Sequence, residues 1–359
     1  MRASATDRVR PEIREISAYH VRDSAGLIKL DAMENPHPWP AGMEDDWLES
    51  LRGVPLNRYP DPSARSLKNC LRKRLDLADD FEILLGNGSD ELIQIIQLCA
   101  AGRDGVIVAP QPSFVMYEMT ARFVGAKFVG VPLAADFTLN EEAMLDAVRE
   151  YRPSVVFLAY PNNPTGNLFD RSAIERIVNE AEGVVVIDEA YHAFADASFA
   201  DQIGRTDNLV IVRTLSKLGL AGLRLGYMIG PALLLDEFDK VRMPYNIGAL
   251  TQRTAEFVLD RLEVFEDQAA QIVAERERVF GVLEEMNGIE PYASQTNFIL
   301  FRSTRLDAPV VFERLVEHGI LIKGFGTSGS SLDQCLRVSI GTRAENEAFT
   351  GALASILSD

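Results

Sequence analysis

The segments SVVFLAYPNNPTG (residues 154–166) and GVVVIDEAY (residues 183–191) decide the fold class of this chain. Each begins with a run rich in Val, Ile, Leu and Phe and ends in polar residues. Continuously apolar strands are typical of a sheet that helices cover on both faces, because neither side of such a strand meets water. Five further runs of this kind are predicted to be strands: residues 81–85, 105–110, 126–133, 209–216 and 225–230.

Helical patterns alternate with these runs. Leu92, Ile95, Ile96 and Cys99 follow the spacing i, i+3, i+4, i+7, which predicts a helix that buries all four side chains. Alternation of strands and helices along a chain favours a mostly parallel sheet with helices on both faces. The sequence therefore predicts an α/β fold.

The two ends of the chain follow other patterns. The first forty residues are rich in Pro and polar side chains, which predicts an extended N-terminal arm. Residues 255–287 predict one long amphipathic helix, with Phe265, Ala269, Ile272, Val279 and Leu283 on its buried side. Short apolar segments at 296–302, 319–325 and 334–341, with a helical pattern before the second, predict a smaller α+β unit. We predict an arm with part of the small domain at 1–45, a large domain at 46–265 and a small domain at 266–359.

Composition excludes several classes of function. The formal charge is −17, from 36 Lys and Arg against 53 Asp and Glu, which argues against nucleic acid or an anionic membrane as a partner. Three cysteines without CxxC spacing and four scattered histidines give no metal-site pattern. The polar N-terminus lacks the apolar core of a signal peptide, and no run of about 18 apolar residues is present. We expect a cytoplasmic protein that binds small molecules and no metal.

Polar residues follow several of the predicted strands, and ligands of open parallel sheets bind beyond the carboxyl ends of the strands. The segment GNGSDELI (residues 86–93) offers Gly86 and Gly88 for a tight turn and Ser89 as a candidate helix cap. Backbone N–H groups at such a helix start can bind a phosphate group. An ordinary strand-to-helix turn explains the same residues, so both interpretations stay open.

Two further strand ends carry reactive groups. Asp188 follows an apolar run, and a buried carboxylate there needs a partner such as a pyridinium N–H, although a loop-capping role explains it equally well. Lys217 lies beside Thr214 and Ser216, and Arg224 follows. A lysine amine forms a Schiff base with an aldehyde when desolvation or nearby cations lower its pKa. Arg224 and the two hydroxyl groups suit a phosphate. A solvated lysine and a structural arginine are the alternative.

The joint pattern resembles the class I and II aminotransferases of pyridoxal-5'-phosphate (PLP) fold type I. The resemblance covers nearly the whole chain and rests on three motifs: Asn163-Pro164-Thr165-Gly166, Asp188-Glu189-Ala190-Tyr191, and Ser216-Lys217 followed by Gly222-Leu223-Arg224. More narrowly, the chain resembles the histidinol-phosphate aminotransferases in LDAMENP (30–36), NRYPDP (57–62), GLAGLRLGY (219–227) and LRVSIGTRAEN (336–346). The resemblance implies a PLP-dependent transaminase with a large PLP-binding domain and a smaller α+β domain.

The resemblance also implies roles for single residues. Lys217 would carry PLP as a Schiff base, Asp188 would pair with its ring nitrogen, and Asn163 and Tyr191 would bind its 3-hydroxyl oxygen. The phosphate region would be held by Ser89, Asp90, Thr214, Ser216 and Arg224, the first two partly through backbone amides. Phe114 would stack on the ring where many relatives have Tyr, or it is an ordinary core residue. Tyr59 would reach the cofactor phosphate of the other subunit, which implies a homodimer.

The substrate side is implied by fewer motifs. Arg337 matches the arginine that binds the anionic group of the substrate, and Tyr19, Asn163 and Lys323 fall where relatives have further substrate contacts. Lys323 stands where arginine is common, and a solvated lysine explains it nearly as well. The implied reaction transfers the amino group between L-glutamate and imidazole acetol phosphate in histidine biosynthesis. An aromatic aminotransferase and a threonine-phosphate decarboxylase of the same fold remain alternatives, and a non-catalytic PLP-binding module is a third.

Overall fold

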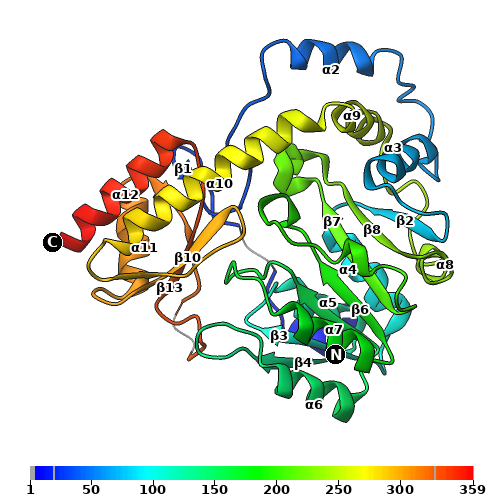
Figure 1. The fold of residues 1–359 in the computed structure, drawn as a ribbon, viewed down its shortest axis with the longest axis horizontal. Helices are drawn as coiled ribbons and strands as arrows, with labels where there is room; N and C mark the ends of the chain where they lie inside the picture. Colours follow the sequence, from blue (N-terminus) through cyan, green and yellow to red (C-terminus); the bar gives the residue numbers. More distant parts are fainter. Residues whose placement is uncertain (1–4, 19–20, 327–328, 359) are drawn as a thin grey trace.

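A seven-stranded sheet forms the centre of the larger unit in the computed structural model, which describes residues 5–18, 21–326 and 329–358. The strand order is β2-β8-β7-β6-β5-β3-β4 (Figure 1). Strand β8 runs antiparallel to both of its neighbours, and the other neighbouring pairs are parallel. The bounds are β2 Phe81–Gly86, β3 Val106–Gln111, β4 Lys127–Pro132, β5 Val155–Ala159, β6 Val184–Asp188, β7 Leu209–Thr214 and β8 Gly226–Pro231. The predicted mostly parallel sheet is confirmed, and each of the seven predicted runs forms a strand.

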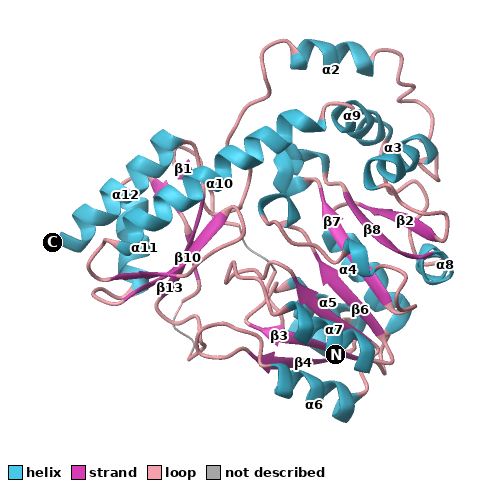
Figure 2. Ribbon diagram, in the orientation of Figure 1, coloured by secondary structure: helices cyan, strands magenta, loops and turns pink. Residues whose placement is uncertain are grey.

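Helices cover both faces of this sheet (Figure 2). Along β5, the side chains of Val155 and Phe157 pack with one group of helices, and those of Val156 and Leu158 pack with the other. The first group is α4 (Ser89–Ala100), α5 (Met116–Val124) and α8 (Ala232–Asp239); the second is α6 (Glu141–Tyr151) and α7 (Arg171–Glu180). Because both faces are buried, the central strands need apolar side chains at successive positions, as the sequence has them.

Cys99 corrects one prediction of burial. Leu92, Ile95 and Ile96 are buried as predicted, but the side chain of Cys99 is exposed. Cys99 is the penultimate residue of α4, which ends at Ala100. The apolar spacing of the sequence therefore continues about one helical turn beyond Ile96, the last of these residues that is buried.

The smaller unit contains a four-stranded antiparallel sheet in the order β12-β13-β10-β9. Its strands are β9 Ile289–Pro291, β10 Phe298–Ser303, β12 Lys323–Gly324 and β13 Cys335–Ser339, and its helices are α11 Ala308–Glu317 and α12 Arg343–Ser358. A second small sheet pairs β1 (Ile28–Lys29) in parallel with β11 (Ile320–Leu321). The arm thus contributes a strand to the small unit.

Helix α10 (Leu262–Glu284) connects the two units (Figure 1). The prediction of one helix over 255–287 is wrong, because α9 (Ala249–Leu259) ends just before α10 begins. Arg261 has a non-helical backbone, with φ −130° and ψ 30°. The predicted stripe of Phe265, Ala269, Ile272, Val279 and Leu283 is buried, as expected. A domain boundary within this helix stays a prediction.

The N-terminal arm passes over both units. Its first described elements are η1 (Ala5–Arg8) and α1 (Pro11–Arg14), which lies against α5, and it continues through β1 to α2 (Met43–Leu51) and α3 (Arg65–Leu75). The side chain of Arg10 donates a hydrogen bond to the carbonyl oxygen of Phe123. The extended arm of the prediction therefore includes two short helical turns.

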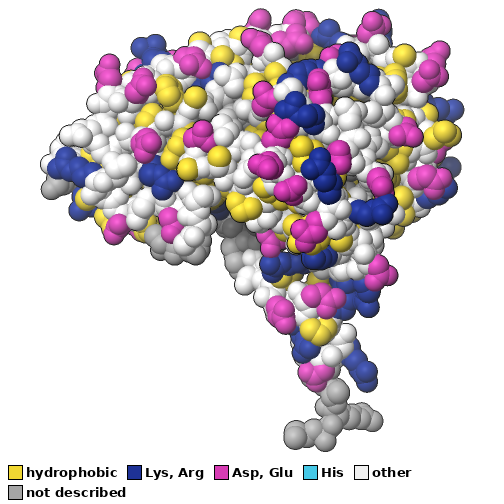
Figure 3. Space-filling model, turned by 60° about the horizontal axis from the view of Figure 1, so that its bottom comes forward, with side chains coloured by type: hydrophobic (Ala, Val, Ile, Leu, Met, Phe, Trp, Pro, Cys, Tyr) yellow, Lys and Arg dark blue, Asp and Glu magenta, His cyan; other side chains and the backbone are white. Residues whose placement is uncertain are grey.

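Acidic and basic side chains are interspersed on the molecular face drawn in Figure 3. The negative net charge is therefore spread among positive groups there, and it does not form a single acidic patch. Within the described part of the chain, the helices are too short or too polar to cross a bilayer.

Candidate active site

A cavity of about 560 Å³, its open mouth included, lies beyond the carboxyl ends of β5, β6 and β7. Ten of the residues predicted to bind the cofactor line it: Ser89, Asp90, Phe114, Asn163, Asp188, Tyr191, Thr214, Ser216, Lys217 and Arg224. They come from α4, the segment before α5, three strand ends and the loops after them. The strand-end argument therefore locates a real cavity, and the roles of its residues stay predictions.

Asp188 is the last residue of β6, and its carboxylate is buried. One oxygen accepts a hydrogen bond from the Tyr117 hydroxyl at 2.7 Å, and the other accepts one from the Ala190 backbone N–H at 3.1 Å. Burial raises the pKa of this carboxyl to about 6, although both hydrogen bonds act in the opposite direction. A cation or a charged N–H donor in the cavity would stabilise the ionised form.

Tyr117 was not predicted from the sequence. It belongs to the first turn of α5, and its ring packs edge-on against that of Phe114, which lies just before the helix, with 5.7 Å between the ring centres. The signal available in the sequence was a phenol group on the apolar side of a helix, where a buried hydroxyl needs a hydrogen-bond partner.

Lys217 lies in η4 (Ser216–Leu220), directly after β7. Its Nζ donates a hydrogen bond to the carbonyl oxygen of Ala32 at 3.2 Å and lies 5.9 Å from the centre of the Tyr191 ring. Burial and then the positive charge of Arg337 lower the pKa of the amine to about 8, against the opposing influence of Asp90. A larger fraction of neutral, nucleophilic amine is therefore present near neutral pH than for an ordinary lysine.

The opposite end of the cavity suits an anion. Helix α4 begins at Ser89 with Gly88 as its N-cap, so the predicted cap by Ser89 is wrong, and no side chain caps this described helix start. Gly88 has φ 81° and ψ 168°, a conformation that essentially only glycine adopts. A Cβ on Gly88 would lie 2.6 Å from a terminal nitrogen of Arg224. The same guanidinium group forms an ion pair with the Asp90 carboxylate at 3.1 Å.

Two hydroxyl groups complete the anion end. The Thr214 hydroxyl donates to the Ser216 hydroxyl at 2.9 Å, and the Ser216 backbone N–H donates to the Thr214 oxygen at 3.1 Å. Together with Arg224 and the N–H groups at the start of α4, these donors form a set that a phosphate group would accept from.

Asn163 connects this cavity to a larger one. Its Nδ2 donates to the Tyr191 hydroxyl at 3.1 Å, and its Oδ1 accepts from Arg337 at 2.6 Å. Burial raises the pKa of Tyr191, so its hydroxyl stays protonated and can donate to a ligand oxygen.

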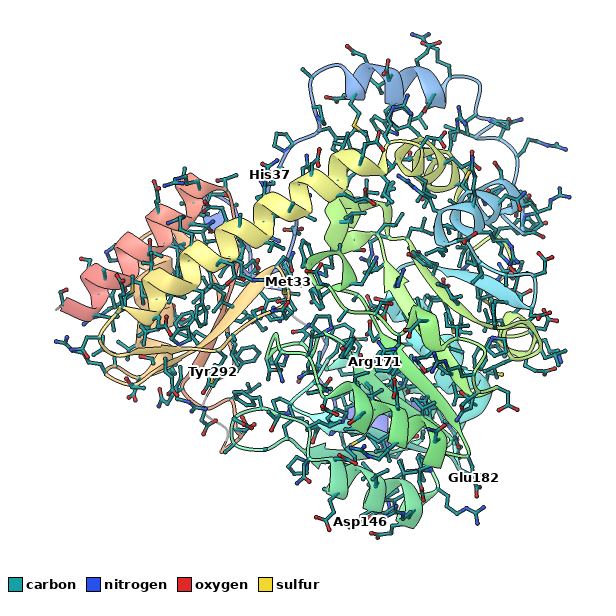
Figure 4. The ribbon with its side chains drawn as sticks, viewed as in Figure 1. Met33, His37, Asp146, Arg171, Glu182 and Tyr292 are labelled. Atoms are coloured by element: carbon teal, nitrogen blue, oxygen red, sulfur yellow. The ribbon has the colours of Figure 1, made fainter. Side chains whose placement is uncertain are left out.

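The larger cleft, about 1810 Å³ with its open mouth, lies between the two units and is lined by Arg337, Lys323 and Asn163. Arg337 on β13 is 6% exposed and also donates to the carbonyl oxygen of Asp31 at 3.0 Å. Burial and the charge of Arg337 lower the pKa of Lys323. Met33 lines both cavities and lies where the arm passes between the units (Figure 4). Two basic side chains on one wall make this cleft suitable for an anionic substrate.

Two predicted residues lie elsewhere. Tyr59 is 81% exposed, stacks on Tyr245 with 4.5 Å between ring centres, and is not among the described residues that line either cavity. Tyr19 lies outside the described residues.

PLP fits the donor set of the smaller cavity. An aldehyde needs an amine of lowered pKa, a pyridinium needs a buried carboxylate, and a phosphate needs the donors at the start of α4. Lys217, Asp188 and Arg224 supply these three groups around one cavity. Because Gly88 has no side chain, the Arg224 guanidinium group can lie close to the backbone at the start of α4.

Comparisons with known proteins agree with this arrangement. The family model "Aminotransferase class I and II" matches residues 26–353. The chain is 49% identical over 345 residues to a histidinol-phosphate aminotransferase of Nitrosococcus oceani, with 96% of each chain covered. It is 47% identical over 356 residues to one of Cupriavidus pinatubonensis, covering 98% of this chain and 97% of the relative. The structure of the Sinorhizobium meliloti enzyme in complex with PLP matches with a TM-score of 0.87 and 25% identity, over 99% of both chains.

Proposed function

Because this chain belongs to the class I and II aminotransferases, we propose that it works in the cytoplasm as a histidinol-phosphate aminotransferase with PLP as its cofactor. It transfers the amino group between L-glutamate and imidazole acetol phosphate, a step of histidine biosynthesis. The observation that carries the proposal is that Lys217 and Asp188 line one cavity, which meets a cleft containing Arg337.

The residues of the chain divide the chemistry between them. When bound, PLP supplies an aldehyde that takes up the amino group and a ring that withdraws electrons from the substrate Cα. Asp188 holds the proton on the ring nitrogen. Lys217 Nζ, with a pKa of about 8, accepts the Cα proton as a general base and donates it again as a general acid.

Arg337 serves both substrates in this proposal. Its planar guanidinium group can bind a carboxylate of glutamate or the phosphate of the second substrate through two parallel hydrogen bonds. Lys323 adds a second positive charge on the same wall of the cleft. Both anions therefore bind in one place, while the reacting carbon atom lies toward Lys217.

The proposed assembly is a homodimer in which Tyr59 contacts the cofactor phosphate of the partner subunit. The support is that Tyr59, its stacking partner Tyr245 and their sequence neighbours Leu56 and Met243 are all exposed large apolar or aromatic side chains. Mixing a Tyr59→Phe variant with a Lys217→Ala variant tests it. Subunit exchange should then produce one active site that contains both native residues, and activity should exceed the sum of the two parents. Additive activity contradicts the proposal.

The activity is tested with purified protein reconstituted with PLP. We expect glutamate-dependent amination of imidazole acetol phosphate to exceed amination of aromatic 2-oxo acids by at least about tenfold in kcat/KM. Release of CO2 from O-phosphothreonine, or the absence of a change in the cofactor spectrum on adding glutamate, contradicts the proposal.

A further inference from the structure

Tyr117 makes a contact that the proposed mechanism does not yet use. Among the described residues, it is the only side chain that hydrogen-bonds the Asp188 carboxylate, with 2.7 Å between the two oxygen atoms. The second hydrogen bond to this carboxylate comes from the Ala190 backbone, which no substitution of a side chain removes. Of the two hydrogen bonds to the Asp188 carboxylate, the one from Tyr117 is therefore the one that a side-chain substitution can remove.

The Tyr117 hydroxyl is held in one position. The side chain is 1% exposed, and its ring stacks on Phe157 with 4.5 Å between centres and 10° between planes. Phe114 packs edge-on against it at 5.7 Å, and the Tyr117 carbonyl accepts from the Gln97 side chain of α4 at 3.1 Å. These contacts hold the phenol oxygen of Tyr117 within hydrogen-bond distance of Asp188.

Electrostatics make the hydroxyl a permanent donor. Burial and then the nearby Asp188 raise the pKa of Tyr117 well above its usual value, so the phenol stays protonated. Its hydrogen bond favours the ionised form of Asp188, whereas burial favours the neutral form. The other charged groups that act on Asp188 are Asp90 at the start of α4 and Glu189 beside it, and both raise its pKa.

We propose that Tyr117 is a positioning residue that keeps the Asp188 carboxylate ionised and directed toward the ring nitrogen of PLP. The start of α5 and the residues just before it then serve the cofactor twice, because Phe114, which packs against Tyr117, lines the cavity where the ring is expected. This inference rests on the PLP chemistry of the proposed function and is independent of which amino acceptor the enzyme uses.

A purely structural role makes a different prediction. Phenylalanine at position 117 would keep the stack on Phe157 and the contact with Phe114, so a packing role predicts a variant with normal properties. A positioning role predicts altered cofactor properties in a normally folded variant. Tyr117→Phe therefore separates the two.

The test measures the Kd of PLP for the apoprotein, and the pH at which the visible spectrum of the bound cofactor changes. We expect Tyr117→Phe to weaken PLP binding roughly tenfold and to shift the spectral midpoint by about one pH unit, as expected for the loss of a hydrogen bond to a charged group. Tyr292→Phe is the matched control. Its hydroxyl also bonds a charged side chain, Arg302 at 3.0 Å, but it lies in the small unit away from the cavity (Figure 4).

Stability of the apoprotein gives a readout without cofactor. The folded pKa of Asp188 lies above the usual 3.8, so its contribution to stability is lost as the pH rises from about 4 through about 6. Removing the Tyr117 donor raises that pKa further. Tyr117→Phe should therefore extend the loss to higher pH, which denaturant titrations at pH 4 to 8 would detect.

An Asp188→Ala background shows whether Tyr117 acts through Asp188. There, Tyr117→Phe should change the Kd of PLP less than about twofold, because the coupled partner is gone. The inference is overturned if Tyr117→Phe matches the native protein in Kd, spectrum and pH-dependent stability, or if its effect is undiminished in this background. Effects of equal size from Tyr292→Phe overturn it as well. Lack of amination activity in a native protein that binds PLP would contradict the proposed function alone.

Discussion

The cofactor cavity and the substrate cleft meet at Met33 and Asn163, yet the chain builds them from different parts. The cofactor cavity takes its polar side chains from strand ends of one buried sheet and from the start of α4. The substrate cleft takes Arg337 from the small unit and fixes it through the backbone of the arm. The cofactor cavity is thus formed mostly by the large unit, with Met33 of the arm at its edge, whereas the substrate cleft needs the large unit, the small unit and the arm together.

Three consecutive backbone carbonyl groups of the arm bind side chains of both units. Those of Asp31, Ala32 and Met33 accept hydrogen bonds from Arg337, Lys217 and Asn297, respectively. Met33 has a positive φ of 54°, which a non-glycine residue adopts at a cost of about 1 kcal/mol. The arm therefore links the reactive lysine to the substrate-binding arginine. Changes at the strand ends should alter cofactor binding, and changes that loosen the arm should alter substrate binding.

The largest effect is expected at Lys217. Lys217→Arg keeps a positive charge but removes the amine that binds the aldehyde and moves the proton, so transamination should fall by roughly 10³-fold or more. Borohydride reduction followed by peptide mapping should locate the pyridoxyl group at residue 217 in the native protein and nowhere in the variant. Lys240→Arg, an exposed lysine of the large unit, is the control. A labelled peptide elsewhere in the native protein would contradict the assignment.

Substitution of Arg337 should separate the two regions. Arg337→Lys loses the hydrogen bonds to Asn163 and Asp31 and the fork that an anion needs, so kcat/KM should fall about 10²-fold. The Kd of PLP should change less than about threefold. Arg302→Lys, on neighbouring strand β10, is the control, since Arg302 bonds the backbone carbonyls of Asp333 and Ser331 and is itself not among the described residues that line the cleft. Equal losses of cofactor and substrate affinity in Arg337→Lys would show that the regions are not separable.

In the cofactor cavity, the sequence could predict several residues but not the contacts that hold them. Asp188 and Lys217 were predicted because each follows a recognisable apolar run, and parallel strands bring such ends to one edge of a sheet. The contact between Lys217 and Ala32 could not be predicted, because it uses a backbone carbonyl and the identity of Ala32 carries no signal. Tyr117 was not predicted because the sequence does not show which group a hydroxyl on an apolar helix face will hydrogen-bond.

Predictions of single helices were wrong where the residue pattern typical of a helix continues past the point at which the helix, or its buried face, ends. The apolar spacing of the 255–287 segment runs on through Asp260 and Arg261, although the backbone leaves the helix there. Cys99 continues the spacing of α4 beyond the last buried turn. Ser89 has the side chain of a helix cap, but Gly88 takes that position because the turn requires its backbone conformation.

Gly88 tests the anion end of the cofactor cavity. Gly88→Ala would place a Cβ against the Arg224 guanidinium group and force an unfavourable backbone, so the Kd of PLP should rise roughly 10- to 100-fold. Gly319→Ala is the control, because Gly319 has a similar φ of 79° and open space around the added carbon. The Kd of pyridoxal, which lacks the phosphate, should change much less in Gly88→Ala. An equal loss for both ligands would place the effect outside the anion end.

The pKa of Lys217 connects the two regions through charge. The rate at which the apoprotein reacts with pyridoxal should fall about tenfold for each pH unit below 8, because the neutral amine becomes scarce. Arg337→Gln removes a charge that lowers this pKa, so the midpoint should move to higher pH, whereas Arg302→Gln should leave it in place. Stopped-flow absorbance between pH 6 and 10 measures both. A native midpoint near the 10.5 of an ordinary lysine would contradict the burial of this amine.

The smallest effect is expected from loosening the arm itself. The Ser339 hydroxyl on β13 accepts a hydrogen bond from the Met33 backbone N–H at 2.8 Å, and so helps to hold the strained turn between the two cavities. Ser339→Ala leaves that N–H without this partner, which should raise the KM for both substrates about three- to tenfold, with little change in the Kd of PLP. Ser303→Ala is closely matched, since both serines are 3% exposed and lie on paired strands, but the Ser303 hydroxyl bonds Leu306 away from the arm. If Ser303→Ala raised the KM as much as Ser339→Ala, the effect would come from the small sheet as a whole and not from the arm.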